Sequence, residues 1–291
     1  MRRFSAVGLA AIVFASSLPG LAQTLEEAMS LYRDRRFPEA RAALEKIANR
    51  EPGNAAACYY LGMTLKRRAD GTALDDAIRW LEKAATLEPT NARYLADFGG
   101  TSLQLAAKNR SYGAATRGRD AMERSLVLDP ANLDARVGLF HFYRQAPWPL
   151  GSSAKAARQL DEIRKRDPAL GTALTVASRA DAGDFAEAFR LCDEVLAKSP
   201  NDYTALYQYG RTSSMSGQNL DRGLANLKQC LELEPPGPAA PSHSNVLNRI
   251  GTLEEKLHHT PEARAAYAAA LQLDPANRQA ADAVARLDRQ K

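Results

Sequence analysis

The sequence predicts an all-α protein built from repeated pairs of helices. Between successive closing prolines, apolar residues recur at helical spacing in two segments separated by a short polar break. Proline ends a helix because it cannot donate the next backbone hydrogen bond and its ring clashes with the preceding turn. One such helix could not bury its apolar face alone, whereas stacked pairs could. The prolines recur every 32 to 41 residues: Pro52, Pro89, Pro130, Pro168, Pro200, Pro235 and Pro275.

Two small-residue signatures accompany this spacing, and residues 244–277 show both most clearly. In most second helices an alanine precedes a large apolar residue by four positions, as in Ala40/Leu44, Ala77/Leu81, Ala156/Leu160, Ala188/Cys192 and Ala263/Tyr267. Several first helices carry an apolar residue followed by glycine, at Leu61-Gly62, Phe98-Gly99, Tyr209-Gly210 and Ile250-Gly251. A small residue at these positions allows the two helices of a pair to cross closely.

These signatures resemble the tetratricopeptide repeat, whose pattern is W-x-x-L-G-x-x-Y, then A-x-x-x-F, then P. The resemblance covers residues 24–277 and implies a right-handed superhelical solenoid of about seven helix-turn-helix units. It also implies that the first helices line a concave surface that binds protein segments. The predicted repeats are residues 24–54, 55–91, 92–132, 133–170, 171–202, 203–236 and 244–277.

Taken in order, three repeats depart from the pattern. In residues 92–132 we expect an insertion around 108–116, and a weak second helix because Gly118 stands where alanine is usual. In residues 133–170, two prolines and a glycine force a loop at Pro147 to Ser153. The repeat at 171–202 is short, and its register places either Arg179 or Ala180 in the core; the apolar pattern favours Ala180.

The two ends of the chain differ from the repeats. Residues 278–291 hold an amphipathic segment expected to cap the exposed end of the stack. Residues 1–22 are expected to be a secretory signal peptide cleaved after Ala22, with a positive start, an apolar stretch and small residues before the cut. The alternative is a retained membrane anchor, but the apolar run is about half of the ~20 residues that a span needs. We therefore expect a periplasmic or secreted protein with no later membrane span.

The three cysteines, Cys58, Cys192 and Cys230, fall at apolar positions of predicted helices. We expect them to be buried thiols that act as small hydrophobic residues. A bridge between Cys192 and Cys230 is the pairing worth testing.

Composition and motifs favour no enzyme class. A net charge of +5, part of it in the leader, is too weak for a nucleic-acid surface. The sequence contains no His-Glu-x-x-His run, phosphate-binding glycine loop, Cys-x-x-Cys or Gly-x-Ser-x-Gly. His258 and His259 are neighbours that would point about 100° apart on a helix, so they cannot chelate one ion together. We expect no catalytic residue, no metal site and no cofactor.

Binding is the better-supported function. Projected onto this sequence, the register of the resembled family gives candidate groove residues on the first helices. Tyrosine and arginine often dominate interface energies, and amides can hold a peptide backbone. The alternative for each tyrosine is packing between repeats, and for each arginine a solvated charge. The candidates are Tyr59, Tyr60, Met63, Arg67, His141, Arg144, Tyr207, Gln208, Arg211, Asn245, Asn248 and Arg249.

Trp148, in the proline-flanked loop, either anchors a partner or packs back onto its own helix pair. The expected function is a non-catalytic periplasmic scaffold that binds a protein or peptide segment. The alternative is a small-ligand-binding accessory protein of a transport or cell-envelope assembly system. A roomy groove closed by the loop at Pro147 would favour that alternative.

Stability in such an array is a sum of repeat and neighbour terms, so irregular repeats should open first. We expect amide hydrogen exchange, followed by mass spectrometry, to be faster in residues 92–132 and 171–202 than in residues 55–91 and 244–277. Slower exchange in the two irregular repeats would contradict this expectation.

Overall fold

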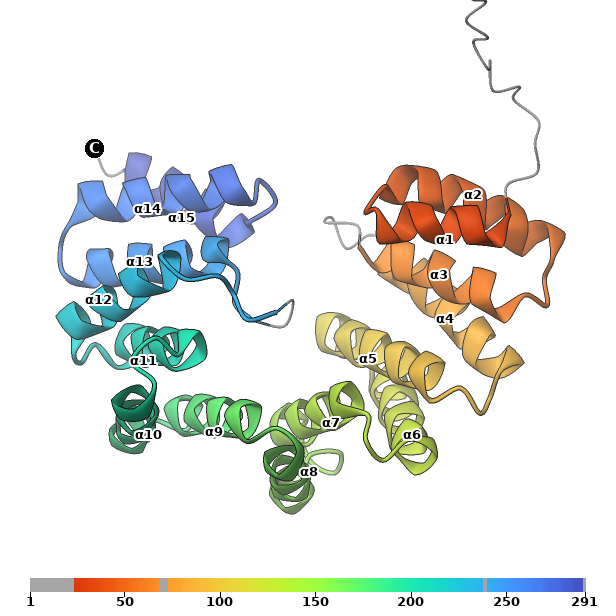
Figure 1. The fold of residues 1–291 in the computed structure, drawn as a ribbon, viewed down its shortest axis with the longest axis horizontal. Helices are drawn as coiled ribbons and strands as arrows, with labels where there is room; N and C mark the ends of the chain where they lie inside the picture. Colours follow the sequence, from red (N-terminus) through yellow and green to blue (C-terminus); the bar gives the residue numbers. More distant parts are fainter. Residues whose placement is uncertain (1–23, 68–72, 238–239, 290–291) are drawn as a thin grey trace, which may run out of the picture. The chain divides into compact units, whose positions relative to one another are not determined.

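The computed structural model describes residues 24–67, 73–237 and 240–289. Within these ranges every regular element is an α-helix, as Figure 1 shows, which confirms the predicted all-α repeat fold. The expected signal peptide, residues 1–22, lies outside the described residues. None of the described helices is long and apolar enough to cross a membrane.

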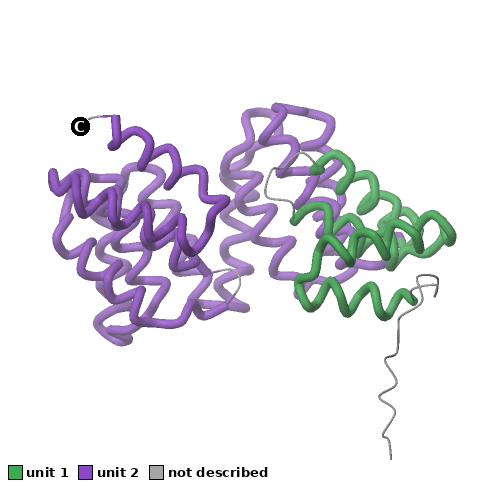
Figure 2. Tube along the Cα trace, turned by 90° about the horizontal axis from the view of Figure 1, so that it is seen from above, with its two compact units in different colours: residues 1–88 green, residues 89–291 purple. Residues whose placement is uncertain are grey.

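The chain divides into two compact units, which Figure 2 colours green and purple. Unit 1 ends at Glu88 and holds two helix pairs. Its helices are α1 (Leu25–Arg33), α2 (Phe37–Arg50), α3 (Ala55–Lys66) and α4 (Leu74–Leu87).

Unit 2 begins at Pro89 and contains the remaining helix pairs and a final helix. Its first helices are α5 (Ala92–Asn109), α7 (Leu133–Gln145), α9 (Pro168–Asp181), α11 (Tyr203–Ser216) and α13 (His243–Lys256). Its second helices are α6 (Tyr112–Leu128), α8 (Ser153–Arg166), α10 (Phe185–Lys198), α12 (Leu220–Leu231) and α14 (Thr260–Leu273). The last helix, α15 (Arg278–Asp288), buries Ala280, Ala283 and Leu287 against α14.

A short proline-containing turn separates most pairs and starts the next helix. Two residues after the closing proline stands an Asn or Asp whose side-chain oxygen accepts a hydrogen bond from a backbone N–H three residues on. Such a cap satisfies an otherwise unpaired donor and is worth about 1 kcal/mol. The capping residues are Asn54, Asn91, Asn132, Asp202 and Asn277.

Pro168 departs from this rule. The sequence placed it as the stop before a first helix that begins at residue 171, but α9 begins at Pro168 itself. Asp167 ends α8 and also caps α9, accepting a hydrogen bond from the backbone N–H of Leu170. Proline is well tolerated at the first helical position because its missing N–H would have no partner there.

Within a pair, the helices touch at the predicted small residues. A Cβ on Gly62 would lie 2.7 Å from Cγ of Leu81, and one on Gly251 would lie 2.7 Å from the Tyr267 ring. At Gly210, an added Cβ would overlap the Leu227 side chain. The glycines therefore let the second helix place a large side chain directly against the backbone of the first.

The expected insertion at 108–116 is instead absorbed by longer helices. Helices α5 and α6 meet at a tight turn in which Arg110 has φ of 52°. Gly118 packs against Gly99, because a Cβ on either residue would lie 2.8 Å from the carbonyl oxygen of the other. The reason for expecting a weak helix at Gly118 therefore does not hold, which leaves residues 171–202 as the repeat expected to exchange fastest.

The core confirms the favoured register of that repeat and the burial of the thiols. Ala180 is buried, whereas Arg179 is exposed. All three cysteines are buried and unpaired. Cys192 and Cys230 belong to separate apolar clusters, and burial raises the pKa of each thiol to about 12.

The crossing geometry predicts opposite effects for two glycine substitutions in unit 2. Gly210→Ala should lower the free energy of unfolding by about 1–3 kcal/mol, because the added methyl group overlaps Leu227. Gly113→Ala, where nothing lies within 4 Å of the new atom, should raise it by about 0.4–1 kcal/mol. Urea denaturation followed by circular dichroism measures both, and equal effects would refute the role assigned to Gly210.

Candidate functional site

The candidate residues of unit 1 lie on and beneath the surface of α3. Tyr59 is 1% exposed, so it packs in the core rather than lining a groove. Its ring meets Tyr60 edge-on with centroids 5.2 Å apart. Tyr60 and Met63 are half-buried, and Arg67 is exposed at the end of the helix. Tyr59 therefore drops out as a contact residue, because a partner could not reach its side chain.

Unit 2 brings candidates from neighbouring first helices into one charged cluster. Asp181, the last residue of α9, accepts hydrogen bonds from Arg144 of α7 and from Arg211 of α11. Arg144 also donates to Ser178 of α9, with 2.5 Å between Nη1 and Oγ. One carboxylate thus joins two guanidinium groups from helices on either side of its own, and the three side chains carry a net positive charge.

The charges change how the groups in this cluster titrate. Burial alone would raise the pKa of Asp181, but the hydrogen bonds from Arg211 and Arg144 outweigh it, so the pKa lies below the usual 3.8. Burial lowers the pKa of His141, and the nearby Arg144 lowers it further against the opposing effect of Asp181. His141 is therefore neutral near pH 7 and can present one ring nitrogen as a donor and the other as an acceptor.

Four predicted residues carry a polar atom that is buried without a hydrogen-bond partner among the described residues. They are His141 Nδ1, Gln208 Oε1, Arg211 Nη1 and Asn248 Oδ1. Leaving such an atom unpaired costs about 1–3 kcal/mol. Ser102 and Asn226, which are not candidate residues, carry such atoms as well. All four candidate residues belong to first helices of unit 2. We call six residues of α7, α9 and α11 the polar face, all of them half-buried except the exposed Asp181: His141, Arg144, Ser178, Asp181, Gln208 and Arg211.

The other candidates of unit 2 are placed differently. Tyr207 is only 9% exposed and packs with Leu227 and Val246 in the core. Asn248 is also buried, whereas Asn245 is exposed and Arg249 half-buried. For Tyr207, packing between repeats is therefore the correct interpretation, since the repeats on either side cover its ring.

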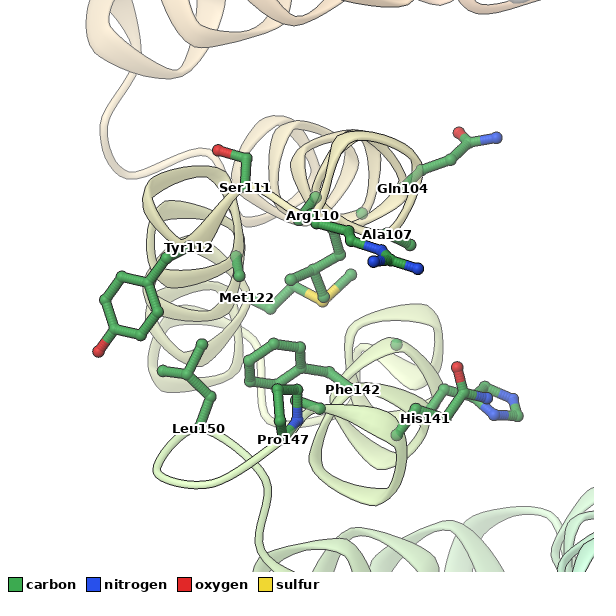
Figure 3. A pocket seen from close by; sticks show the side chains of 17 residues that line it. Gln104, Ala107, Arg110, Ser111, Tyr112, Met122, His141, Phe142, Pro147 and Leu150 are labelled. Carbon is green, nitrogen blue, oxygen red and sulfur yellow. The ribbon is translucent and has the colours of Figure 1, made fainter.

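A pocket of about 710 Å³ lies between α5, α6 and α7. In Figure 3, Met122 extends from α6 into the space between α5 and α7, with Phe142, Pro147 and Leu150 nearby. The lining is mostly apolar, and Gln104, Arg110, Ser111 and His141 supply polar atoms.

The loop after α7 forms one wall of this pocket through Ala146, Pro147 and Leu150. The carbonyl of Pro147 accepts hydrogen bonds from the backbone N–H groups of Leu150 and Gly151, which fold the loop into a tight turn. Leu150 is buried, but Trp148 is 90% exposed and does not pack back onto its helix pair. The loop thus presents an aromatic ring to solvent beside the pocket.

Sequence reasoning missed Asp181, Ser178 and the pocket. Asp181 ends a degenerate helix, and nothing in the local pattern separates it from other surface acids. The apolar residues Leu103 and Phe142 follow the helical period of ordinary core positions. Only the packing of α5 and α6 against α7 shows that these residues border a pocket rather than a filled interior.

The described residues offer little for metal chemistry. No three His, Cys, Asp or Glu side chains in the part of the chain that the structure describes are placed to hold a metal ion. Oε2 of Glu254 accepts a hydrogen bond from Nδ1 of His259, with 2.9 Å between the two atoms, and both His258 and His259 lie in an exposed turn.

Neither a protein-family model nor a curated protein matches this sequence. Solved structures do match it. A tetratricopeptide repeat protein from Parabacteroides merdae has a TM-score of 0.65 at 16% identity, covering 90% of this chain and 96% of that one. Yeast Tom70 has a TM-score of 0.65 at 17% identity, covering 96% of this chain and 59% of that one.

A chain of the APC/C hetero-tetramer Cut9–Hcn1 has a TM-score of 0.54 at 16% identity, covering 90% of this chain and 48% of that one. The present chain thus spans less than two thirds of the matched chains of Tom70 and of this complex. At such identities the likeness concerns the fold, and the fold of this chain is that of tetratricopeptide-repeat proteins.

The charged cluster predicts a pH-dependent effect of Asp181→Asn. Near pH 7 the variant should be about 1–2 kcal/mol less stable, because two partly buried arginines lose their shared anion. A carboxyl whose pKa is lowered on folding stabilises the protein above its unfolded pKa and loses that contribution as the pH falls. The difference should therefore narrow below about pH 4.

Urea denaturation across this pH range measures the effect. Asp161→Asn serves as the control, since Asp161 pairs with Arg164 on the exposed surface of α8 and should contribute under about 0.5 kcal/mol. A deficit for Asp181→Asn no larger than that of the control would contradict the prediction.

Proposed function

We propose that this protein is a non-catalytic scaffold that binds a segment of a partner protein on the polar face of unit 2. The observation that carries the proposal is the charged cluster in which Arg144 and Arg211, from helices on either side of α9, share the single carboxylate of Asp181. Partly buried charges that are only partly compensated cost free energy, so a protein keeps such a cluster more readily where it serves a function.

The chemistry of the face suits an extended peptide with acidic side chains. The Gln208 amide and the neutral His141 ring can exchange hydrogen bonds with a peptide backbone. Arg144 and Arg211 outnumber the single carboxylate between them, and a guanidinium group can hold an incoming carboxylate through two parallel hydrogen bonds. An acidic segment would therefore neutralise the remaining positive charge.

The structural neighbours support a scaffold over an enzyme. One of them is part of the hetero-tetramer Cut9–Hcn1, in which a chain of this fold is assembled with a different protein. For location, we propose the periplasm, on the evidence of the leader-like residues 1–22.

A second candidate function is the binding of a small ligand as an accessory protein of a transport or cell-envelope assembly system. The specific observation in its favour is the pocket beside the Pro147 loop. Its volume falls within the range of about 300–1,000 Å³ that is usual for small-molecule sites.

The scaffold proposal predicts that Arg211→Ala abolishes partner capture while Arg222→Ala preserves it. The two arginines are matched, since each lies in unit 2 and pairs with an aspartate of the preceding helix pair. They differ in position, because Arg211 belongs to the polar face on α11 and Arg222 to the second helix α12.

The measurement is affinity capture from a cell-envelope extract, followed by mass spectrometry, with circular dichroism to verify that each variant is folded. A protein recovered by wild type and by Arg222→Ala but lost with Arg211→Ala supports the proposal. A protein recovered equally by all three forms would move the binding site away from the polar face.

A further inference from the structure

We propose that the pocket between α5, α6 and α7 binds a fatty carboxylate, with the hydrocarbon chain inside the pocket and the carboxylate paired with Arg110. The inference rests on the second candidate function and names its class of ligand. It does not depend on the polar face, although His141 borders both sites.

The interior of the pocket suits an unbranched hydrocarbon. Leu103, Met122, Phe142 and Leu150 provide its apolar surface, and the small side chains of Ala106, Ala107 and Ala115 leave the space open. Burying each methylene group strengthens binding by about fourfold, so a chain of many methylenes gains more here than a small polar molecule.

Two glycines shape the pocket around Met122. A Cβ on Gly100 would lie 3.2 Å from Met122 Cε, and a Cβ on Gly138 would overlap the end of the same side chain. Because neither residue has a Cβ, the thioether reaches in between α5 and α7, as Figure 3 shows. Methionine is unbranched and adapts its rotamers, so it can move along an alkyl chain of variable length.

The charge of Arg110 at the pocket indicates which polar group the ligand would carry. Arg110 follows α5 in the left-handed region, and its side chain extends beside Ala107 between α5 and α7 in Figure 3. It forms no ion pair with any residue that the structure describes, and no Asp or Glu lines the pocket. The other polar lining groups, which include Gln104, Ser111 and Gln145, are uncharged.

An unpaired guanidinium group at the edge of an apolar pocket is complementary to a ligand with one anion at the end of a hydrocarbon chain. A neutral apolar ligand would leave the guanidinium group of Arg110 without a counter-charge, and a short anion would leave the apolar lining of the pocket exposed to water. The two features together therefore point to a fatty carboxylate.

The test is isothermal titration calorimetry of the full chain with dodecanoate, below its micelle-forming concentration, compared with dodecanol. Arg110→Glu reverses the charge at the pocket. Arg117→Glu makes the same change on α6 at an exposed residue that does not line the pocket. Ala107→Trp places a large ring at the lining, and circular dichroism verifies the fold of each variant.

We expect wild type to bind dodecanoate more tightly than dodecanol. Arg110→Glu should weaken dodecanoate binding by about fivefold or more, since an ion pair at an accessible site contributes up to about that factor and reversal adds repulsion. Arg117→Glu should leave the affinity close to that of wild type, and Ala107→Trp should abolish binding.

Three results would overturn the inference in distinguishable ways. If dodecanol binds as tightly as dodecanoate and Arg110→Glu has no effect, the carboxylate assignment fails while the small-ligand function stands. If neither compound binds wild type, the apolar-ligand function of the pocket fails as well. Equal weakening by Arg110→Glu and Arg117→Glu would show a general charge effect and would also refute the role of Arg110.

Discussion

The close crossing of the two helices in each pair is the constraint on which the rest of this structure depends. At Gly62, Gly210 and Gly251 the first helix has no Cβ, and a large side chain of the second helix occupies that space. This contact buries the apolar face of both helices at once, which neither could do alone in water. Because this contact lies within a pair, the stability of each pair depends on its own packing and on the pairs next to it. The residues on the outward faces of the first helices are therefore not fixed by the packing and can differ in chemistry.

Unit 2 uses that freedom in two ways. On α7, α9 and α11 the exposed side is polar, and Asp181 joins Arg144 and Arg211 into one network. The network uses only part of the hydrogen-bonding capacity of the two arginines and leaves a net positive charge, and the proposed acidic partner would pair with that charge.

Between α5 and α7 the same architecture produces a pocket instead. The loop from Pro147 to Leu150 closes one side, and glycines at positions 100 and 138 keep the helices from filling the space with their own side chains. The polar face and the pocket share His141 but differ in what they can bind. One is a charged surface suited to a peptide, and the other is an apolar interior with a cation at its edge. The proposed protein segment and the proposed small amphiphile would therefore occupy different sites that share one residue, His141.

The sequence by itself determined the helix pairs, because proline stops, Asn and Asp caps and small residues at crossing points act within a few residues of one another. The apolar pattern also placed Ala180 in the core. The register of the resembled repeat family put His141, Arg144, Gln208 and Arg211 among the candidate groove residues. It misplaced Tyr59 and Tyr207, because the helical period fixes a direction but not whether the next pair covers that side chain. The roles of Asp181, Arg110 and the pocket were decided by the tertiary structure alone, since they depend on how one helix pair packs against the next.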